Sequence, residues 1–304
     1  MRERHGADEA SAEPLVSVAS LSRTFGSKKA LDDVTLAVSR GCVFGLVGEN
    51  GAGKSTLIKH LLGLWRAERG EVRVFGLDPV LEPTTVLGRI GYLSEQPDLP
   101  GWMRVDELLR YTRAFYPRWD TAYATQLLEQ FGLDLDARVK TLSKGQRARL
   151  GLIAAEAHRP DLLILDEPSS GLDPIVRRDI LEAIIRTITD EGRTVIFSSH
   201  LLDEVERVSD HVAMLHQGTL KLCAPLDDIK AQHRRIVLRF TVPHADPPNV
   251  PGAIRVEGAG REWTVICDGS RIHVPAMAQS LGASIVDDCA ASLDEIFVAH
   301  AAVN

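Results

Sequence analysis

Residues 48–55, with the sequence GENGAGKS, decide the fold of this 304-residue chain. They match the phosphate-binding pattern G-x-x-x-x-G-K-[ST] in full. The apolar run CVFGLV (42–47) comes directly before them, and residues 55–65 (STLIKHLLGLW) place apolar side chains at helical spacing directly after. Strand, loop and helix stand in the order that the pattern requires. The sequence therefore predicts a nucleotide-binding site rather than a glycine-rich turn with a solvated lysine.

The residue types in this loop explain how it would hold a phosphate. Glycines at 48, 51 and 53 let the backbone bend around the β-phosphate with its N–H groups turned inward, at the positive end of the following helix. We expect Lys54 to reach the β- and γ-phosphate oxygens and Ser55 to give its hydroxyl to magnesium.

A second apolar run ends in two acidic residues. Residues 162–167 read LLILDE, which is typical of a buried strand whose last residues, Asp166 and Glu167, face the nucleotide. We expect Asp166 to hold magnesium through water and Glu167 to act as the general base on the attacking water. The alternative is a pair of solvated carboxylates that begin a turn before Pro168.

The pattern on both sides of these motifs predicts an α/β fold of the phosphate-loop NTPase class. Residues 15–40 alternate apolar and polar side chains, which indicates an antiparallel β patch with a turn near Gly26. Residues 91–149 predict a helical insert. Parallel core strands are predicted at 162–167 and 194–199, with helices at 174–189 and 201–208.

The sequence changes character near Ile236. Residues 242–253 (VPHADPPNVPGA) hold four prolines and a glycine, and the segments around them read as short strands, a helix near 275–281 and a closing helix at 293–301. We predict three parts: a disordered polar tail at 1–14, a nucleotide-binding domain at 15–235 and a small α+β accessory domain at 236–304.

Composition limits the function further. The count of basic minus acidic residues is 35 − 42 = −7, which argues against a protein built mainly to bind nucleic acid or anionic lipid. The longest apolar runs are far below the ~20 residues that cross a bilayer. The polar N-terminus has no secretory pattern, so we expect a cytoplasmic chain. The four cysteines lie far apart without a C-x-x-C pair, so we expect them to be small buried hydrophobic residues rather than metal ligands.

Further motifs, taken together, resemble those of the ATP-binding cassette (ABC) family, the ATPase subunits of ABC transporters. The resemblance covers about residues 15–230 and includes both motifs above. In the family's order, GYLSEQ (91–96) resembles the Q-loop, LSKGQ (142–146) the signature motif, SSGLD (169–173) the D-loop and SSH (198–200) the switch histidine. Lys144 stands where the signature motif more commonly has glycine.

The resemblance implies hydrolysis of ATP with Mg²⁺ as cofactor. It implies that Phe25 stacks on the adenine and that His200 acts in catalysis by sensing the γ-phosphate. The implied nucleotide contacts are Phe25, Gly48, Asn50, Gly51, Ala52, Gly53, Lys54, Ser55 and Thr56 of one chain, with Ser143, Gly145 and Gln146 of a second chain. The implied metal contacts are Ser55, Asp166 and either Glu95 or Gln96, between which the sequence does not choose.

The resemblance also implies partners. This chain is expected to close head to tail with a second copy, or with a related ATPase subunit, and to drive a membrane-spanning permease subunit. That arrangement places it peripherally on the inner face of the cell membrane. Residues 113–120 and 292–298 resemble exporter-type subunits, so export is expected. No nucleic-acid partner is expected; the alternative function is a soluble ABC ATPase that acts on nucleic acid or ribosomes.

Several alternatives stay open at the level of sequence. Phe25 is either the adenine platform or a core residue of the β patch, and Asp173 either contacts the partner subunit or forms a turn. A protein that binds ATP without turnover is disfavoured by the joint presence of the predicted catalytic side chains. The insert's aromatic residues form either a permease-docking surface or, as we favour for most, its core: Tyr111, Phe115, Tyr116 and Trp119.

Overall fold

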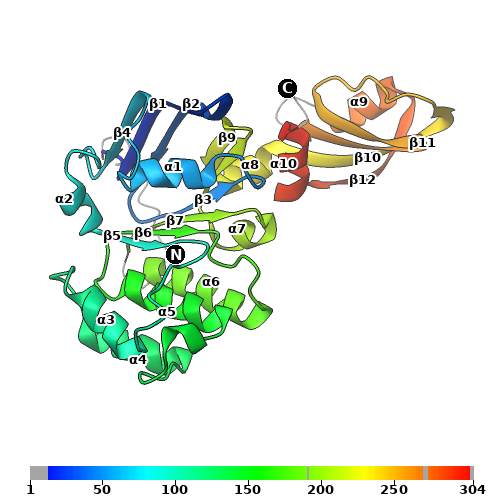
Figure 1. Ribbon diagram of the computed structural model, residues 1–304. Helices are drawn as coiled ribbons and strands as arrows, with labels where there is room; N and C mark the ends of the chain where they lie inside the picture. The colour runs from blue at the N-terminus through cyan, green and yellow to red at the C-terminus, as the bar shows by residue number, and fades with distance from the viewer. Residues whose placement is uncertain (1–12, 190–191, 270–272, 302–304) are drawn as a thin grey trace, which may run out of the picture.

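A six-stranded sheet forms the centre of the protein (Figure 1), of which a computed structural model describes residues 13–189, 192–269 and 273–301. The predicted tail lies, apart from its last two residues, outside the described residues. In spatial order the sheet contains β5 (Ile90–Leu93), β6 (Leu162–Asp166), β7 (Thr194–Ser199), β3 (Val43–Val47), β8 (His211–His216) and β9 (Thr219–Pro225). All neighbours pair in parallel except β8 and β9. The predicted parallel core is confirmed, with one antiparallel edge strand added.

An antiparallel sheet covers one face of this core. It contains β1 (Val16–Phe25), β2 (Lys28–Val38) and β4 (Arg69–Val74), in the order β2-β1-β4. Helix α1 (Lys54–Leu61) lies between the two sheets (Figure 1), where its apolar face is buried with side chains from both. Gly26, with φ of 58°, forms the turn between β1 and β2, so the predicted β patch is confirmed.

Helices cover the opposite face of the central sheet (Figure 1). The helices nearest to it are α5 (Lys144–Glu156), α6 (Pro174–Thr189) and α7 (Leu202–Val208), and those further out are α3 (Val105–Arg113) and α4 (Thr121–Phe131). The short helix α2 (Pro83–Leu87) and a 3-10 turn (Val139–Thr141) complete this part. Among the described residues, none of the helices has the length and apolar character needed to cross a membrane.

The aromatic residues of the helical insert divide between core and surface. Tyr116 stacks on the buried His158 at a centroid distance of 3.8 Å, and Trp119 packs against the main apolar core. Tyr111 and Phe115 are 52% and 62% exposed and form an edge-to-face pair 5.1 Å apart. Our preference for a core position therefore holds for two of the four, and the other two form an aromatic surface.

The C-terminal part forms a separate three-stranded antiparallel sheet. After α8 (Leu226–Gln232), the sheet has the order β11-β10-β12, built from β10 (His233–His244), β11 (Ala253–Asp268) and β12 (Ala283–Ala290), with α9 (Val274–Ser280) packed on it. Its own apolar core includes Ile236, Trp263 and Met277. The two short strands suggested by the sequence after residue 252 are one long strand, β11.

The last helix, α10 (Leu293–Ala301), returns to the nucleotide-binding domain. Figure 1 shows it between that domain and the C-terminal sheet, and it packs against both α7 and β11. Ile296 and Phe297 are buried in the same apolar core as Leu202 and Val205 of α7. A chain segment inside the predicted accessory domain is therefore packed as part of the larger domain.

Candidate active site

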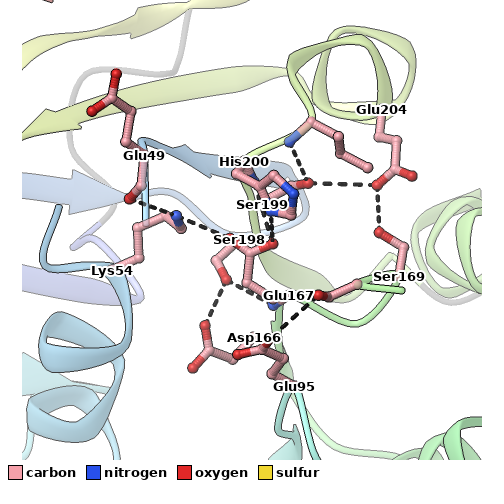
Figure 2. Close-up of polar contacts among 12 residues, drawn as sticks. Glu49, Lys54, Glu95, Asp166, Glu167, Ser169, Ser198, Ser199, His200 and Glu204 are labelled. Carbon is pink, nitrogen blue, oxygen red and sulfur yellow. Dashed lines mark hydrogen bonds and ion pairs between the residues drawn. The ribbon is translucent and has the colours of Figure 1, made fainter. Parts of the chain in front are cut away.

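Three central strands deliver the predicted catalytic residues to one edge of the sheet. The phosphate loop follows β3, Glu167 follows β6 and His200 follows β7. Because β6 and β7 pair in parallel with Asp166 opposite Ser198, their polar ends lie side by side. Figure 2 shows the resulting cluster of side chains. The ends of parallel strands are the usual place for a ligand in an open α/β sheet.

The backbone of the phosphate loop requires glycine at two positions. Gly53 has φ of 113° and precedes α1, and a Cβ atom on it would lie 2.6 Å from the carbonyl oxygen of Ala30. A Cβ atom on Gly48 would lie 2.4 Å from the carbonyl oxygen of Leu215. Both distances are too short for any other residue, so these glycines let the loop pass close to neighbouring backbone.

The ammonium group of Lys54 lies folded into the loop. Its Nζ donates to the carbonyl oxygens of Gly48 at 2.5 Å and Glu49 at 3.2 Å, and forms an ion pair of 2.9 Å with Glu167 Oε1. Only 5% of Lys54 is exposed. A buried cation in this position adds a positive charge at the N-terminus of α1, where the helix dipole already favours an anion.

Glu167 is held by groups from two segments, the phosphate loop and the end of β7. Its backbone N–H donates to Ser198 Oγ at 2.9 Å, and its Oε2 accepts from His200 Nδ1 at 2.6 Å. Since a carboxylate only accepts, Nδ1 of His200 carries the hydrogen. Glu167 is 6% exposed and has φ of 49°, a left-handed conformation that is strained for a non-glycine residue. Strain of this kind is concentrated at functional sites.

Asp166 lies beside Glu167 in a desolvated position. Ser198 Oγ donates to Asp166 Oδ1 at 2.7 Å. Burial raises the pKa of Asp166, and hydrogen bonds from Ser198 and Ser55 oppose that shift. Burial also raises the pKa of Tyr92, on β5, to about 12, with a smaller contribution from the charge of Asp166. A carboxylate in such surroundings favours a neighbouring cation.

A cavity of about 460 Å³ opens over the phosphate loop. Its lining includes the predicted residues Asn50, Gly51, Gly53, Lys54, Ser55, Thr56 and Glu167. Glu95 also lines it, whereas Gln96 lines only a neighbouring cavity, so the structure brings Glu95 and not Gln96 to the phosphate loop. Ser55, Asp166 and Glu95 offer the oxygen ligands that Mg²⁺ prefers, and the residues present fit this cofactor.

Two residues on either side of the turn between β1 and β2 also line this cavity. Phe25 lines the cavity, is 41% exposed and contacts Trp65 edge to face at 5.0 Å, so it is not a core residue of the β patch. Lys28 lines the cavity as well. Sequence reasoning missed Lys28; its only signal was its place three residues after Phe25 across a tight turn.

The signature segment lies apart from the phosphate loop of the same chain. Ser143 caps α5, because its Oγ accepts from the Gln146 N–H at 3.1 Å while its own N–H donates to Gln146 Oε1 at 2.9 Å. Gly145 packs closely on Val176, where a Cβ atom would lie 2.7 Å from a methyl carbon. None of these signature residues lines the phosphate-loop cavity.

Sequence reasoning also missed Glu204, which connects the loops of the site. It is 1% exposed, and it accepts from Ser169 Oγ at 2.6 Å and pairs with Arg177 Nε at 3.0 Å. Figure 2 shows it bridging Ser169, after β6, and Ser199, at the end of β7. Burial raises the pKa of Glu204. It fixes the loop that carries Glu167 against the loop that carries His200.

Fold and site together define an ABC-type ATPase, and comparisons with known proteins agree. The ABC transporter family pattern matches residues 31–170. The daunorubicin/doxorubicin resistance ATP-binding protein DrrA of Streptomyces peucetius is 32% identical over 310 residues, covering 93% of this chain and 91% of DrrA. The bacitracin transport ATP-binding protein BcrA of Bacillus licheniformis is 33% identical over 73% of each chain.

A solved structure described as an ATP-binding subunit of an ABC transporter is also similar. It has a TM-score of 0.65 and 33% sequence identity, covering 72% of this chain and 92% of that one. The chain therefore belongs to the ABC transporter family, as an ATP-binding subunit with the ATPase cassette. The family resemblance and the ATPase activity predicted from the sequence are confirmed.

Proposed function

We propose that Glu167 is the general base of ATP hydrolysis in this chain and that Lys54 and His200 orient it. One observation supports this most strongly: Glu167 Oε1 lies 2.9 Å from Lys54 Nζ, and Oε2 lies 2.6 Å from His200 Nδ1. With both oxygens held, the carboxylate has one orientation, and its burial strengthens both contacts. Such a carboxylate can accept a proton from the water that attacks the γ-phosphate.

Lys54 links phosphate binding to the general base. A phosphate in the loop draws the ammonium group away from the neutral carbonyls of Gly48 and Glu49, because charged acceptors bind it more strongly. Glu167 Oε1 is then free to accept from water, while His200 keeps Oε2 in place. Ser55, Asp166 and Glu95 would hold Mg²⁺, which when bound neutralises charge on the phosphate oxygens.

The functional unit in this proposal is a head-to-tail dimer, of two copies or of this chain with a related ATPase subunit. Its support is the placement of the signature segment, whose capped helix start offers Ser143 and backbone N–H groups to an anion but lies outside the phosphate-loop cavity of its own chain. A second chain would bring its Ser143 to this cavity. Each of the two sites then contains residues from both chains.

Mixing two inactive variants tests this arrangement. Lys54→Ala removes phosphate binding, and Ser143→Asp keeps a good helix cap but places a negative charge against the partner's phosphate. Each variant alone should lose phosphate release. Their mixture should regain about a quarter of the wild-type rate, because half of the dimers are mixed and each has one complete site. A mixture that stays inactive, while pull-down through a tag on one variant recovers the other variant, would contradict the head-to-tail arrangement.

A membrane-spanning permease is the proposed partner. A mainly apolar cavity of about 360 Å³ lies between β5 and the helical insert, lined by residues that include Leu87, Leu99 and Tyr116. The exposed pair Tyr111 and Phe115 lies on α3 and directly after it, on the same insert. An exposed aromatic surface beside an apolar groove fits a short helix of a partner. The chain would thereby attach to the inner face of the membrane, and the resistance role in the name of DrrA favours export.

Replacing the aromatic pair tests the permease surface. The double variant Tyr111→Ala/Phe115→Ala should lose co-purification with a co-expressed permease subunit that the wild-type chain retains, while ATP binding stays at the wild-type level. The matched control is Val242→Ala, which removes an exposed apolar side chain from the C-terminal sheet. Retention of the permease by the double variant would place the docking surface elsewhere.

A further inference from the structure

Glu95 lies between two cavities. It lines the phosphate-loop cavity together with Lys54 and Ser55. It also lines the neighbouring cavity of about 340 Å³, to which Lys144 and Ser170 contribute. Because the Glu95 carboxylate faces both cavities, a change in its position at the phosphate loop can be transmitted to residues at the start of α5.

Ser170 joins Glu95 to Lys144 directly. Its Oγ donates to Glu95 Oε1 at 3.2 Å, and its carbonyl oxygen accepts from Lys144 Nζ at 2.7 Å. Its backbone N–H donates to the carbonyl oxygen of Glu167 at 3.1 Å. One residue in the turn after β6 therefore connects the start of α5, the carboxylate at the phosphates and the proposed general base.

The turn after β6 is shaped to receive the ammonium group. Gly171 has φ of 61°, and a Cβ atom on it would lie 2.6 Å from Lys144 Nζ, so a larger residue would displace the lysine. Lys144 is also the first residue of α5, where the helix dipole disfavours a positive charge. The hydrogen bond to the Ser170 carbonyl oxygen offsets that cost, so a tertiary contact holds the lysine here.

We propose that Lys144 is a positioning residue that sets the orientation of Glu95 through Ser170. The inference rests on the proposed role of Glu95 as an oxygen ligand of Mg²⁺. The hydrogen bond from Lys144 Nζ to the Ser170 carbonyl oxygen fixes the turn after β6. The fixed turn orients the Ser170 hydroxyl, which donates to Glu95 Oε1. Because Lys144 follows Ser143, the segment that meets the partner's nucleotide is connected to the metal ligand at the chain's own nucleotide.

The Mg²⁺ concentration for half-maximal ATP hydrolysis tests this connection. Lys144→Met and Glu95→Ala should each raise it about tenfold, and the double variant should equal Glu95→Ala alone to within about twofold, because residues in one network are not additive. Lys144→Arg should keep the wild-type value. Lys140→Met is the matched control, since Lys140 is an exposed lysine four residues earlier. Thermal unfolding should be unchanged in all of these variants.

Three results separate the possible failures. If the two shifts multiply to about a hundredfold in the double variant, Lys144 acts independently of Glu95 and the inference is wrong. If Glu95→Ala shifts the Mg²⁺ requirement but Lys144→Met does not, the connection fails while the proposed metal site stands. If Glu95→Ala causes no shift, the metal role of Glu95 fails and the inference fails with it.

Discussion

The nucleotide site of the cassette and the C-terminal sheet place charged pairs in opposite surroundings. In the cassette, Lys54 and Glu167 are almost fully buried and bonded to each other at the ends of parallel strands. On the C-terminal sheet, Arg239 pairs with Glu262 across neighbouring strands with more than half of both side chains exposed. Buried charges act strongly on a nearby phosphate, whereas exposed pairs contribute only about 0–1 kcal/mol. The comparison locates the chemistry in one domain of the chain.

Helix α10 qualifies this contrast. It follows the C-terminal sheet in sequence, yet its apolar face is buried in the core of the cassette. Arg255 of β11 donates to the carbonyl oxygen of Val298, and the backbone N–H of Leu293 donates to Glu206 of α7, so the helix is bonded on both sides. The two domains therefore differ in chemistry but share a structural element.

The first prediction, one of the two with the largest expected effect, compares two lysines that each pair with a glutamate. Lys54→Ala should lower phosphate release at saturating Mg-ATP on the order of 10²–10³-fold, because a preorganised charge at the phosphates is lost. Lys230→Ala, which removes the pair with Glu206 at 2.5 Å beside the C-terminal sheet, should change it by less than about twofold. Equal losses of phosphate release in the two variants would contradict the claim that the buried lysine at the sheet edge contributes more to catalysis than the partly exposed one.

The next effect concerns stability and tests whether α10 belongs to the cassette core. Ile296→Ala should lower the free energy of unfolding by about 2–5 kcal/mol, since it leaves a cavity among fully buried side chains. Ile285→Ala, in the exposed edge strand β12, should cost less than about 0.5 kcal/mol. Urea unfolding measures both. An unchanged cassette transition in Ile296→Ala would contradict the shared core.

A buried histidine of the cassette should make stability depend on pH. His158 is 1% exposed and its Nε2 lies 3.0 Å from the carbonyl oxygen of Ile90; burial lowers its pKa to about 4. The unfolded value is about 6.5, so between these values the unfolded chain binds more protons, and the unfolding free energy falls with falling pH by up to ~3 kcal/mol. Above pH ~6.5 this contribution is complete.

The comparison with His158→Gln isolates this contribution from that of other groups. Glutamine keeps a donor for Ile90 but does not titrate, so the difference in unfolding free energy between wild type and variant should shrink from pH 7.5 towards pH ~4.5. Urea unfolding at several pH values measures it. A difference that stays constant with pH would show that His158 is not held in its neutral form.

The smallest expected effect concerns Asp173, whose Oδ1 accepts from the N–H groups of Ile175 and Val176 at 3.0 and 3.1 Å. Asp173→Ala should lower the free energy of unfolding by about 1 kcal/mol through loss of this cap, and Asp173→Asn should restore it. Thermal or urea unfolding measures both variants. A loss of ATP turnover in Asp173→Asn at unchanged stability would instead reveal a contact with the partner subunit.

Local patterns were sufficient to predict most of the cassette. Three short motifs have a structure that their neighbours in sequence determine: the phosphate loop, the acidic end of β6, and the serines and histidine at the end of β7. The register between strands could not be predicted from the sequence. It places Ser198 beside Asp166, where its Oγ donates to the Asp166 carboxylate and accepts from the backbone N–H of Glu167. Glu204 was missed for the same reason, because its partners come from separate loops.

Two further features of the structure could not be predicted from the sequence, for physical reasons. The Q-loop offered Glu95 and Gln96 one residue apart, and only the path of the chain after β5 decides which one lines the phosphate-loop cavity. The closing helix was predicted correctly, but the core in which it is buried was not, because an apolar helix face does not specify the core against which it packs. The structure shows that it packs against α7.

The most direct test of the central claim compares two glutamates, one at the nucleotide site and one on α10 beside the C-terminal sheet. Glu167→Gln should lower single-turnover phosphate release by about 10²–10⁴-fold, the contribution of a general base, while equilibrium binding of a fluorescent ATP analogue stays unchanged. Glu295→Gln, which alters a carboxylate that pairs with Arg235 beside the C-terminal sheet, should leave both at the wild-type level. Wild-type phosphate release by Glu167→Gln would contradict the assignment of the catalytic site.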